Sequence, residues 1–139
     1  MTIQTPVSKA AELVALVEQI AERAYPILES LPESEQWDLQ TKIRHEAVDA
    51  LATISEACGA LDPRDITWRL SQGRGHLSSL ASLVKLARKS HGIDLNPHYM
   101  LDIKKSIAII DEEIPSMPVK AKEWLQAYSM VLSQEDKPS

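Results

Sequence analysis

The sequence is poor in cysteine and in aromatic residues, and it has no long apolar run. It contains one cysteine, Cys58, no phenylalanine, and only three tryptophans and three tyrosines. A single cysteine cannot form an internal disulfide, and no apolar stretch approaches the roughly 20 residues that a membrane-spanning helix needs. The chain also lacks a basic leader followed by an apolar run, the pattern of a secretory signal. These absences favour a cytoplasmic protein without a membrane partner.

β-Hairpin signals, repeats of fixed period and low-complexity segments are missing as well. Apolar residues instead recur at three- and four-residue spacing, as on the buried face of amphipathic helices. A chain of 139 residues, of which 44% are hydrophobic, is long enough to bury a core of its own. The sequence therefore predicts a single all-α domain over residues 1–139.

Proline and glycine mark where the predicted helices begin and end. Asp62-Pro63 and Asn96-Pro97 each place proline in the first turn after a capping side chain. Gly59 and Gly92 are placed to end the helices before them in the left-handed conformation. Pro26 lies inside the first helical pattern, where it predicts a kink or a local break.

These signals predict four long helices and one short helix. The expected ranges are 8–31, 33–58, 62–91, 97–114 and, after two prolines that break or bend the chain, 118–132. Short connections favour antiparallel neighbours. The sequence therefore predicts an antiparallel up-down four-helix bundle with a short bent or broken C-terminal helical extension.

The third predicted helix is the one basic part of an acidic chain. Residues 62–92 contain six Lys and Arg against two Asp, whereas the whole chain has a formal net charge of −5. Gly73 and Gly75 inside this helix each cost about 1 kcal/mol relative to alanine, so close approach of a neighbouring backbone is expected there. A seam at four-three spacing follows the helix: Ile66, Leu70, Gly73, Leu77, Leu80, Val84, Ala87 and His91.

Basic residues of the third and fourth helices are the candidate contact residues. Lysine and arginine that neutralise phosphates supply most of the non-specific affinity for nucleic acid. The same side chains could instead form ion pairs with carboxylates of other helices or subunits, and the sequence leaves both open. Because only Trp68 interleaves with the charges, a base-stacking platform is not indicated. The set comprises Arg69, Arg74, Lys85, Arg88, Lys89, Lys104 and Lys105.

No group of residues indicates catalysis, a cofactor or a metal. Cys58 lies at a helix C-terminus, where nothing lowers its pKa, so a buried inert thiol is expected. Gly73-Arg74-Gly75 is not a phosphate loop, because no strand precedes it and no Gly-Lys-Ser/Thr ending follows. His45 and Asp49 share one side of a helix, but a third metal ligand at suitable spacing is missing. We therefore expect no catalytic residues, no cofactor and no metal.

Two tryptophans, Trp68 and Trp124, are candidates for a subunit interface. Large rings near helix ends often anchor contacts between protomers. The alternative is that they close the ends of the chain's own core.

Three stretches of the chain resemble known proteins. The first comprises Leu31-Pro32-Glu33-Ser34-Glu35, Lys42-Ile43-Arg44-His45-Glu46-Ala47-Val48-Asp49 and Ile54-Ser55-Glu56-Ala57. It resembles the second helix of the bacterial four helix bundle protein family, which is encoded in intervening sequences of large-subunit ribosomal RNA genes. Gly75-His76-Leu77-Ser78-Ser79-Leu80, with Leu86-Ala87 and Gly92, resembles the third helix of that family. Tyr25-Pro26-Ile27-Leu28-Glu29-Ser30-Leu31-Pro32 resembles the first helix end of the related accessory variability proteins of diversity-generating retroelements.

The resemblance implies a bundle that assembles into a pentameric barrel with a basic, nucleic-acid-binding surface. In retroelements, the barrel binds the reverse transcriptase and its template RNA. The leading hypothesis is therefore a non-enzymatic accessory protein that forms an oligomeric ring and binds nucleic acid, a reverse transcriptase or both. The alternative is a scaffold or protein-interaction module, of the ribosomal intervening-sequence type, that binds no nucleic acid.

Overall fold

The computed structural model describes residues 9–135. It is all-helical, which confirms the prediction of an all-α fold. No strand occurs between residues 9 and 135, and none of the helices described there is both long and apolar enough to cross a membrane. In α5, the side chains of residues 119, 127, 128, 130–132, 134 and 135 lie outside the description. The elements are α1 (Lys9–Ser30), the 3₁₀ turn η1 (Glu33–Glu35), α2 (Leu39–Gly59), α3 (Pro63–His91), α4 (Pro97–Glu113), the 3₁₀ turn η2 (Ile114–Ser116) and α5 (Met117–Glu135).

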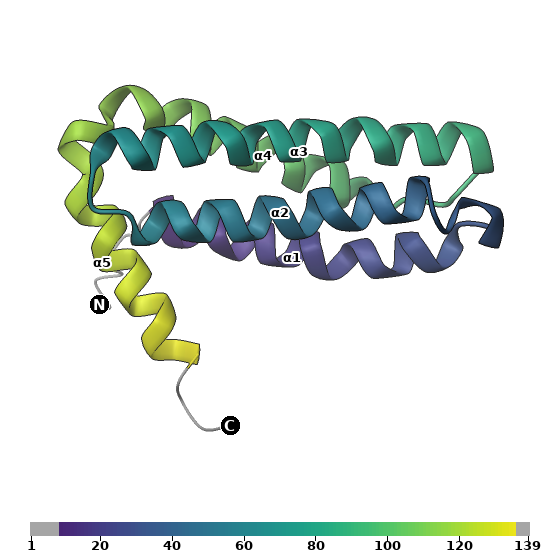
Figure 1. Ribbon diagram of the computed structural model, residues 1–139, viewed down its shortest axis with the longest axis horizontal. Coiled ribbons are helices and arrows are strands. Elements are labelled where there is room, and N and C mark those ends of the chain that lie inside the picture. The colour runs from purple at the N-terminus through teal and green to yellow at the C-terminus, as the bar shows by residue number, and fades with distance from the viewer. Residues whose placement is uncertain (1–8, 136–139) are drawn as a thin grey trace, which may run out of the picture.

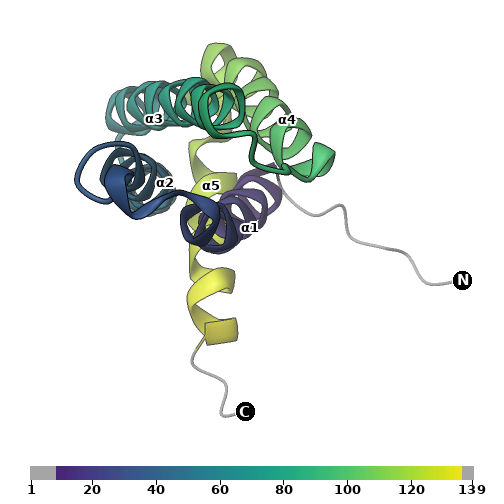
Figure 2. The same ribbon diagram turned by 90° about the vertical axis from the view of Figure 1, so that its right-hand side faces the viewer.

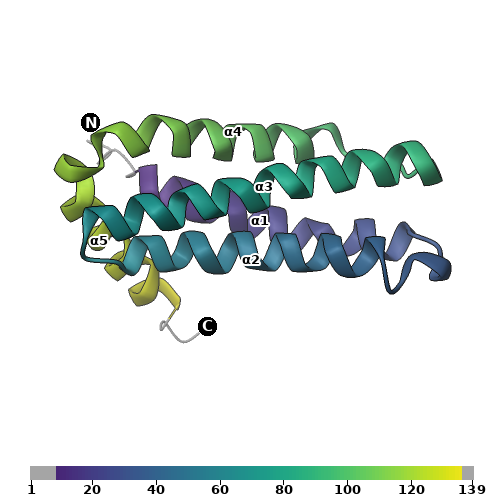
Figure 3. The ribbon, with the colours of Figure 1, turned by 45° about the horizontal axis from the view of Figure 1, so that its top comes forward.

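Helices α1 to α4 lie side by side, and α5 turns away across one end of them (Figure 1). Consecutive long helices run in opposite directions, and α2 and α4 each pack against both α1 and α3 (Figure 2). The α2–α3 turn and the start of α5 lie at one end, which we call the α5 end (Figure 3). The turn η1 and the last turn of α3 lie at the other end, which we call the η1 end.

Capping side chains begin α3 and α4 where the sequence predicts. The Asp62 carboxylate accepts a hydrogen bond from the Arg64 backbone N–H at 2.9 Å, and the Asn96 side chain accepts one from the His98 N–H at 3.0 Å. At the end of α3, Gly92 is left-handed with φ of 62°, and its N–H donates to the Arg88 carbonyl. These contacts satisfy backbone groups that a helix terminus leaves without a partner.

Helix α2 differs from the prediction at both ends. It begins at Leu39 rather than near residue 33, because residues 33–38 form the turn η1 and a connection that carries Trp37 into solvent. Its last residue is Gly59, and Ala60 then takes an extended conformation, so Gly59 is not the predicted left-handed stop. Helix α1 continues through Pro26 without the local break that proline allowed.

The seam of α3 forms a central part of the core. Its residues from Ile66 to Ala87 are buried, whereas His91 is exposed and lies 3.4 Å from the Glu35 carboxylate. A Cβ atom on Gly73 would lie 2.6 Å from Cγ1 of Ile54, so α2 and α3 approach closely at this point. Nothing lies within 4 Å of a Cβ built on Gly75, which makes the expected close approach wrong for that glycine.

Buried side chains hold the start of α5 against the other helices. Trp124 is 1% exposed and Met117 is fully buried. The ammonium of Lys120 lies 2.9 Å from a carboxylate oxygen of Glu113, which is itself 2% exposed at the end of α4. A buried carboxylate is costly without a partner of opposite charge, so this ion pair favours the observed corner between α4 and α5.

Candidate functional site

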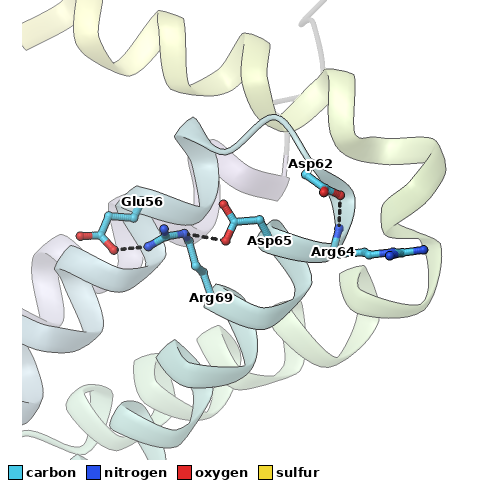
Figure 4. A network of polar contacts seen from close by, with 5 residues as sticks. All are labelled: Glu56, Asp62, Arg64, Asp65 and Arg69. Carbon is cyan, nitrogen blue, oxygen red and sulfur yellow. Dashed lines mark hydrogen bonds and ion pairs between the residues drawn. The ribbon is translucent and has the colours of Figure 1, made fainter.

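The candidate contact residues in the first half of α3 are held in ion pairs. The guanidinium of Arg69 lies 3.1 Å from Asp65, one turn earlier, and 2.5 Å from Glu56 on α2. Figure 4 shows Arg69 between these two carboxylates. Because Nε and one terminal nitrogen of Arg69 already face carboxylates, these two negative charges compete with a phosphate for the guanidinium.

Arg74 is paired in the same way, but with α4. Its Nε and one terminal nitrogen lie 2.6 and 3.2 Å from the two carboxylate oxygens of Asp111. This two-point geometry suits the planar guanidinium. The hydrogen bonds to Asp111, and then its charge, raise the pKa of Arg74 above its ordinary value. The pair connects α3 to α4 across 37 residues of sequence.

A third member of the set, Lys105 on α4, lies 3.5 Å from Glu12 on α1. The lysine side chain is mostly exposed, and the glutamate side chain is partly exposed. Exposed pairs of this kind contribute little to stability. Lys105 nevertheless has a carboxylate of its own chain as a partner.

The remaining four residues are exposed and have no carboxylate partner among residues 9–135. Lys85, Arg88 and Lys89 are on the last two turns of α3, at the η1 end, and Lys104 is on α4. Residues three and four apart are neighbours on a helix surface, so Lys85, Arg88 and Lys89 form one group, which we call the α3 basic triad. Positive charge near a helix C-terminus also complements the helix dipole. The triad therefore stabilises the end of α3 in addition to any role in binding a ligand.

The two tryptophan candidates lie in different environments. Trp124 is 1% exposed and belongs to the core, which favours the alternative that its ring closes the end of the chain's own core. Trp68 is 58% exposed near the start of α3 and borders an open groove of about 380 Å³. The groove is lined by Pro63, Arg64, Thr67, Trp68, Ser71 and Pro118.

Sequence reasoning missed this groove, because it joins the first turns of α3 to the start of α5. Pro118 is 50 residues from Trp68 in the sequence, and only the folded chain brings them together. The exposure of Trp37, at 87%, was also not foreseen. The sequence does contain a signal for this exposure, because Trp37 follows four polar residues and precedes an aspartate.

The groups weighed for catalysis and metal binding are not assembled into a centre. Cys58 is buried, and burial raises the pKa of its thiol to about 12, so it is protonated at neutral pH. His45 and Asp49 are exposed on α2. Within the described part of the chain, no group of three or more His, Cys, Asp or Glu side chains is arranged to hold a metal ion.

One further cavity, of about 280 Å³, lies between α1 and the start of α4. Its wall includes Pro26, Leu95 and Tyr99. The Tyr99 hydroxyl is buried without a protein hydrogen-bond partner, and burial raises its pKa. A buried hydroxyl of this kind is satisfied where a water molecule occupies the adjoining cavity.

Comparison of the chain with known protein families, with curated proteins and with solved structures gave no match. The resemblance drawn from the second and third helices therefore stays a prediction.

Proposed function

We propose that this protein is a non-catalytic accessory protein that binds nucleic acid through the α3 basic triad. In this proposal, α1 to α4 form an antiparallel up-down four-helix bundle, and α5 is a bent extension. The observation that carries the proposal is the contrast in pairing. Lys85, Arg88 and Lys89 are exposed and have no carboxylate partner among the described residues, whereas Arg69 and Arg74 each do.

The triad is suited to phosphates rather than to bases. Three cations within about one helical turn can neutralise neighbouring phosphates of a backbone. The exposed ring of Trp68 lies 17 residues before Lys85, which is about 25 Å along a helix. Aromatic stacking therefore does not accompany the charges, and the expected binding is independent of base sequence.

The resemblance to the four helix bundle family adds partners to this proposal. It supports a ring of five subunits and association with a reverse transcriptase and its RNA. Light scattering on the purified protein tests the ring directly, with five times the subunit mass of 15.5 kDa as the expected result. A monodisperse monomer at every concentration would contradict it.

A scaffold or protein-interaction module without nucleic acid is the second candidate. It is favoured by the internal pairing of Arg69, Arg74 and Lys105, which removes three of the seven candidate cations. The net charge of −5 also repels a polyanion at long range. In this case the basic triad stabilises the end of α3 and nothing more.

Binding of a structured RNA and of a primer-template duplex at low salt separates the two candidates. We expect Arg88→Glu to weaken binding by about tenfold or more, because it replaces a phosphate contact with a repulsive charge. Lys122→Glu is the matched control, since it makes the same change of charge at an exposed position of α5, at the opposite end. Equal effects of the two variants, or no binding by a folded wild type, would reject the nucleic-acid proposal.

A further inference from the structure

The two exposed tryptophans lie at opposite ends of the molecule. Trp37 is 87% exposed next to η1, and Trp68 is 58% exposed near the start of α3 at the α5 end. Isolated apolar residues on a surface need no explanation, but tryptophan is enriched where proteins contact one another. One of these rings projects from the surface, and the other borders a groove.

The groove at the α5 end is largely apolar. Pro63 and Trp68 come from the first turns of α3, and Pro118 comes from the start of α5. Leu61, in the turn just before α3, is 76% exposed beside them in the sequence. This end of the molecule therefore presents apolar surface that no part of residues 9–135 covers.

Arg64 adds one uncompensated positive charge to the groove. Its backbone N–H donates to Asp62, but its guanidinium has no carboxylate partner among the described residues. Figure 4 shows the Arg64 side chain pointing away from Asp62, Asp65 and Glu56, whereas Arg69 lies between two carboxylates. A ligand for this groove therefore combines an apolar group with a negative charge.

The segment around Trp37 has this chemistry. Glu33 is exposed and has no cationic partner among the described residues, and Asp38 adjoins the ring in sequence. Asp38 lies 3.1 Å from Lys42, but both side chains are mostly exposed, so the pair is weak and easily exchanged. An exposed ring flanked by carboxylates at the η1 end thus complements an apolar groove with a free arginine at the α5 end.

We propose that copies of this chain associate head to tail, with Trp37 of one protomer in the Trp68 groove of the next. Arg64 of the second protomer then faces Glu33 and Asp38 of the first. Because the two surfaces lie at opposite ends of the chain, copies that associate head to tail make a heterologous contact, which repeats from copy to copy. It forms a ring if the rotation between copies closes and a filament if it does not. The inference rests on the self-association part of the proposed function and is independent of nucleic-acid binding.

Sedimentation velocity over a concentration series tests the contact. We expect Trp37→Ala and Trp68→Ala each to weaken self-association by about 30-fold or more, as for a tryptophan at the centre of an interface. Leu101→Ala, which also truncates an exposed apolar side chain, is the control and is expected to leave association unchanged. Circular dichroism confirms that each variant is folded.

Mixing the two tryptophan variants gives the sharper result. Trp68→Ala keeps the projecting Trp37, and Trp37→Ala keeps the groove, so an equimolar mixture retains one intact contact per pair. The expected species is a dimer of one copy of each variant, which cannot extend further. A contact of Trp37 with Trp37, or of one groove with another, would give no such dimer. Absence of the dimer alongside an associating wild type would overturn the proposal.

Charge reversal checks the role of Arg64. Arg64→Glu is expected to weaken association, and Glu33→Arg with Asp38→Arg in the same chain is expected to restore it. A monomeric wild type, or association that none of these variants changes, would also overturn the head-to-tail contact. RNA binding by the Trp37→Ala protein is measured in parallel. If RNA binding persists while the head-to-tail contact fails, the nucleic-acid proposal stays intact. If self-association behaves as expected while RNA binding is absent, the head-to-tail contact stays intact.

Discussion

The two halves of α3 carry the same kinds of residue in different surroundings. In the first half, beyond the first turn, Arg69 and Arg74 contact carboxylates of α2 and α4. In the second half, Lys85, Arg88 and Lys89 have no such partner between residues 9 and 135. A count of basic residues along a helix therefore does not measure the charge that the helix offers to a ligand.

The difference arises from what the neighbouring helices place opposite each half. Where α2 and α3 approach closely, at Ile54 and Gly73, Glu56 of α2 comes within reach of Arg69. On the other side, α4 brings Asp111 to Arg74. Packing of apolar and small residues thus determines which cations are neutralised.

Changing Gly73 is expected to have the largest effect on this arrangement. In Gly73→Leu, the new side chain meets Ile54, which forces α2 and α3 apart and lowers the free energy of unfolding by about 1–3 kcal/mol. Urea unfolding followed by circular dichroism measures this change. Gly75→Ala is the matched control: its Cβ meets nothing, so the better helix propensity of alanine raises stability by about 0.5–1 kcal/mol. Equal destabilisation by both variants would contradict the close approach.

The sequence was sufficient for the starts of α3 and α4, because local capping chemistry determines them. The cap of α3 is Asp62, followed by Pro63, and the cap of α4 is Asn96, both as predicted. The start of α2 was misplaced, because residues 33–38 contain acidic and capping residues that suit either a first helical turn or a 3₁₀ turn. Only the need to reverse the chain before Leu39 decides between them.

The pairing of the candidate site could not be predicted in the same way. Asp111 is 37 residues from Arg74, so its contact depends on the register between two helices. Trp68 and Trp124 both lie near helix starts in amphipathic patterns, yet one is exposed and the other is in the core. That distinction follows from the turn at η2, which directs α5 back over the other helices.

Alkaline pH is expected to have the next largest effect on the free energy of unfolding. It acts on the thiol of Cys58, which lies at the end of α2, shortly before the start of α3 in the sequence. Burial raises the pKa of Cys58 from its ordinary 9.0 to about 12, so the folded protein retains the thiol proton that the unfolded chain releases. Stability is therefore complete below pH 9 and falls as pH rises toward 12, by about 1 kcal/mol at pH 10. Cys58→Ala should show a smaller loss between pH 9 and 10, and identical pH profiles would contradict a buried, protonated thiol.

Neutralising single cations of α3 is expected to have the smallest effect on stability. Arg69→Gln removes two partly exposed ion pairs and should lower the free energy of unfolding by about 0.5–1 kcal/mol. Arg88→Gln removes no carboxylate contact and should change it by less than that. If Arg88→Gln proves the more destabilising variant, the distinction between the two halves fails.

The salt dependence of RNA binding by the same two variants shows whether the α3 basic triad, rather than Arg69, contacts phosphates. The logarithm of the binding constant is measured against the logarithm of salt concentration for the wild type, Arg88→Gln and Arg69→Gln. Three phosphate contacts by the basic triad predict a slope of about −2 to −3, and loss of one contact lowers its magnitude by about 1. We expect that reduction for Arg88→Gln and an unchanged slope for Arg69→Gln. Equal slopes for all three proteins, or a reduction only in Arg69→Gln, would contradict phosphate binding by the α3 basic triad.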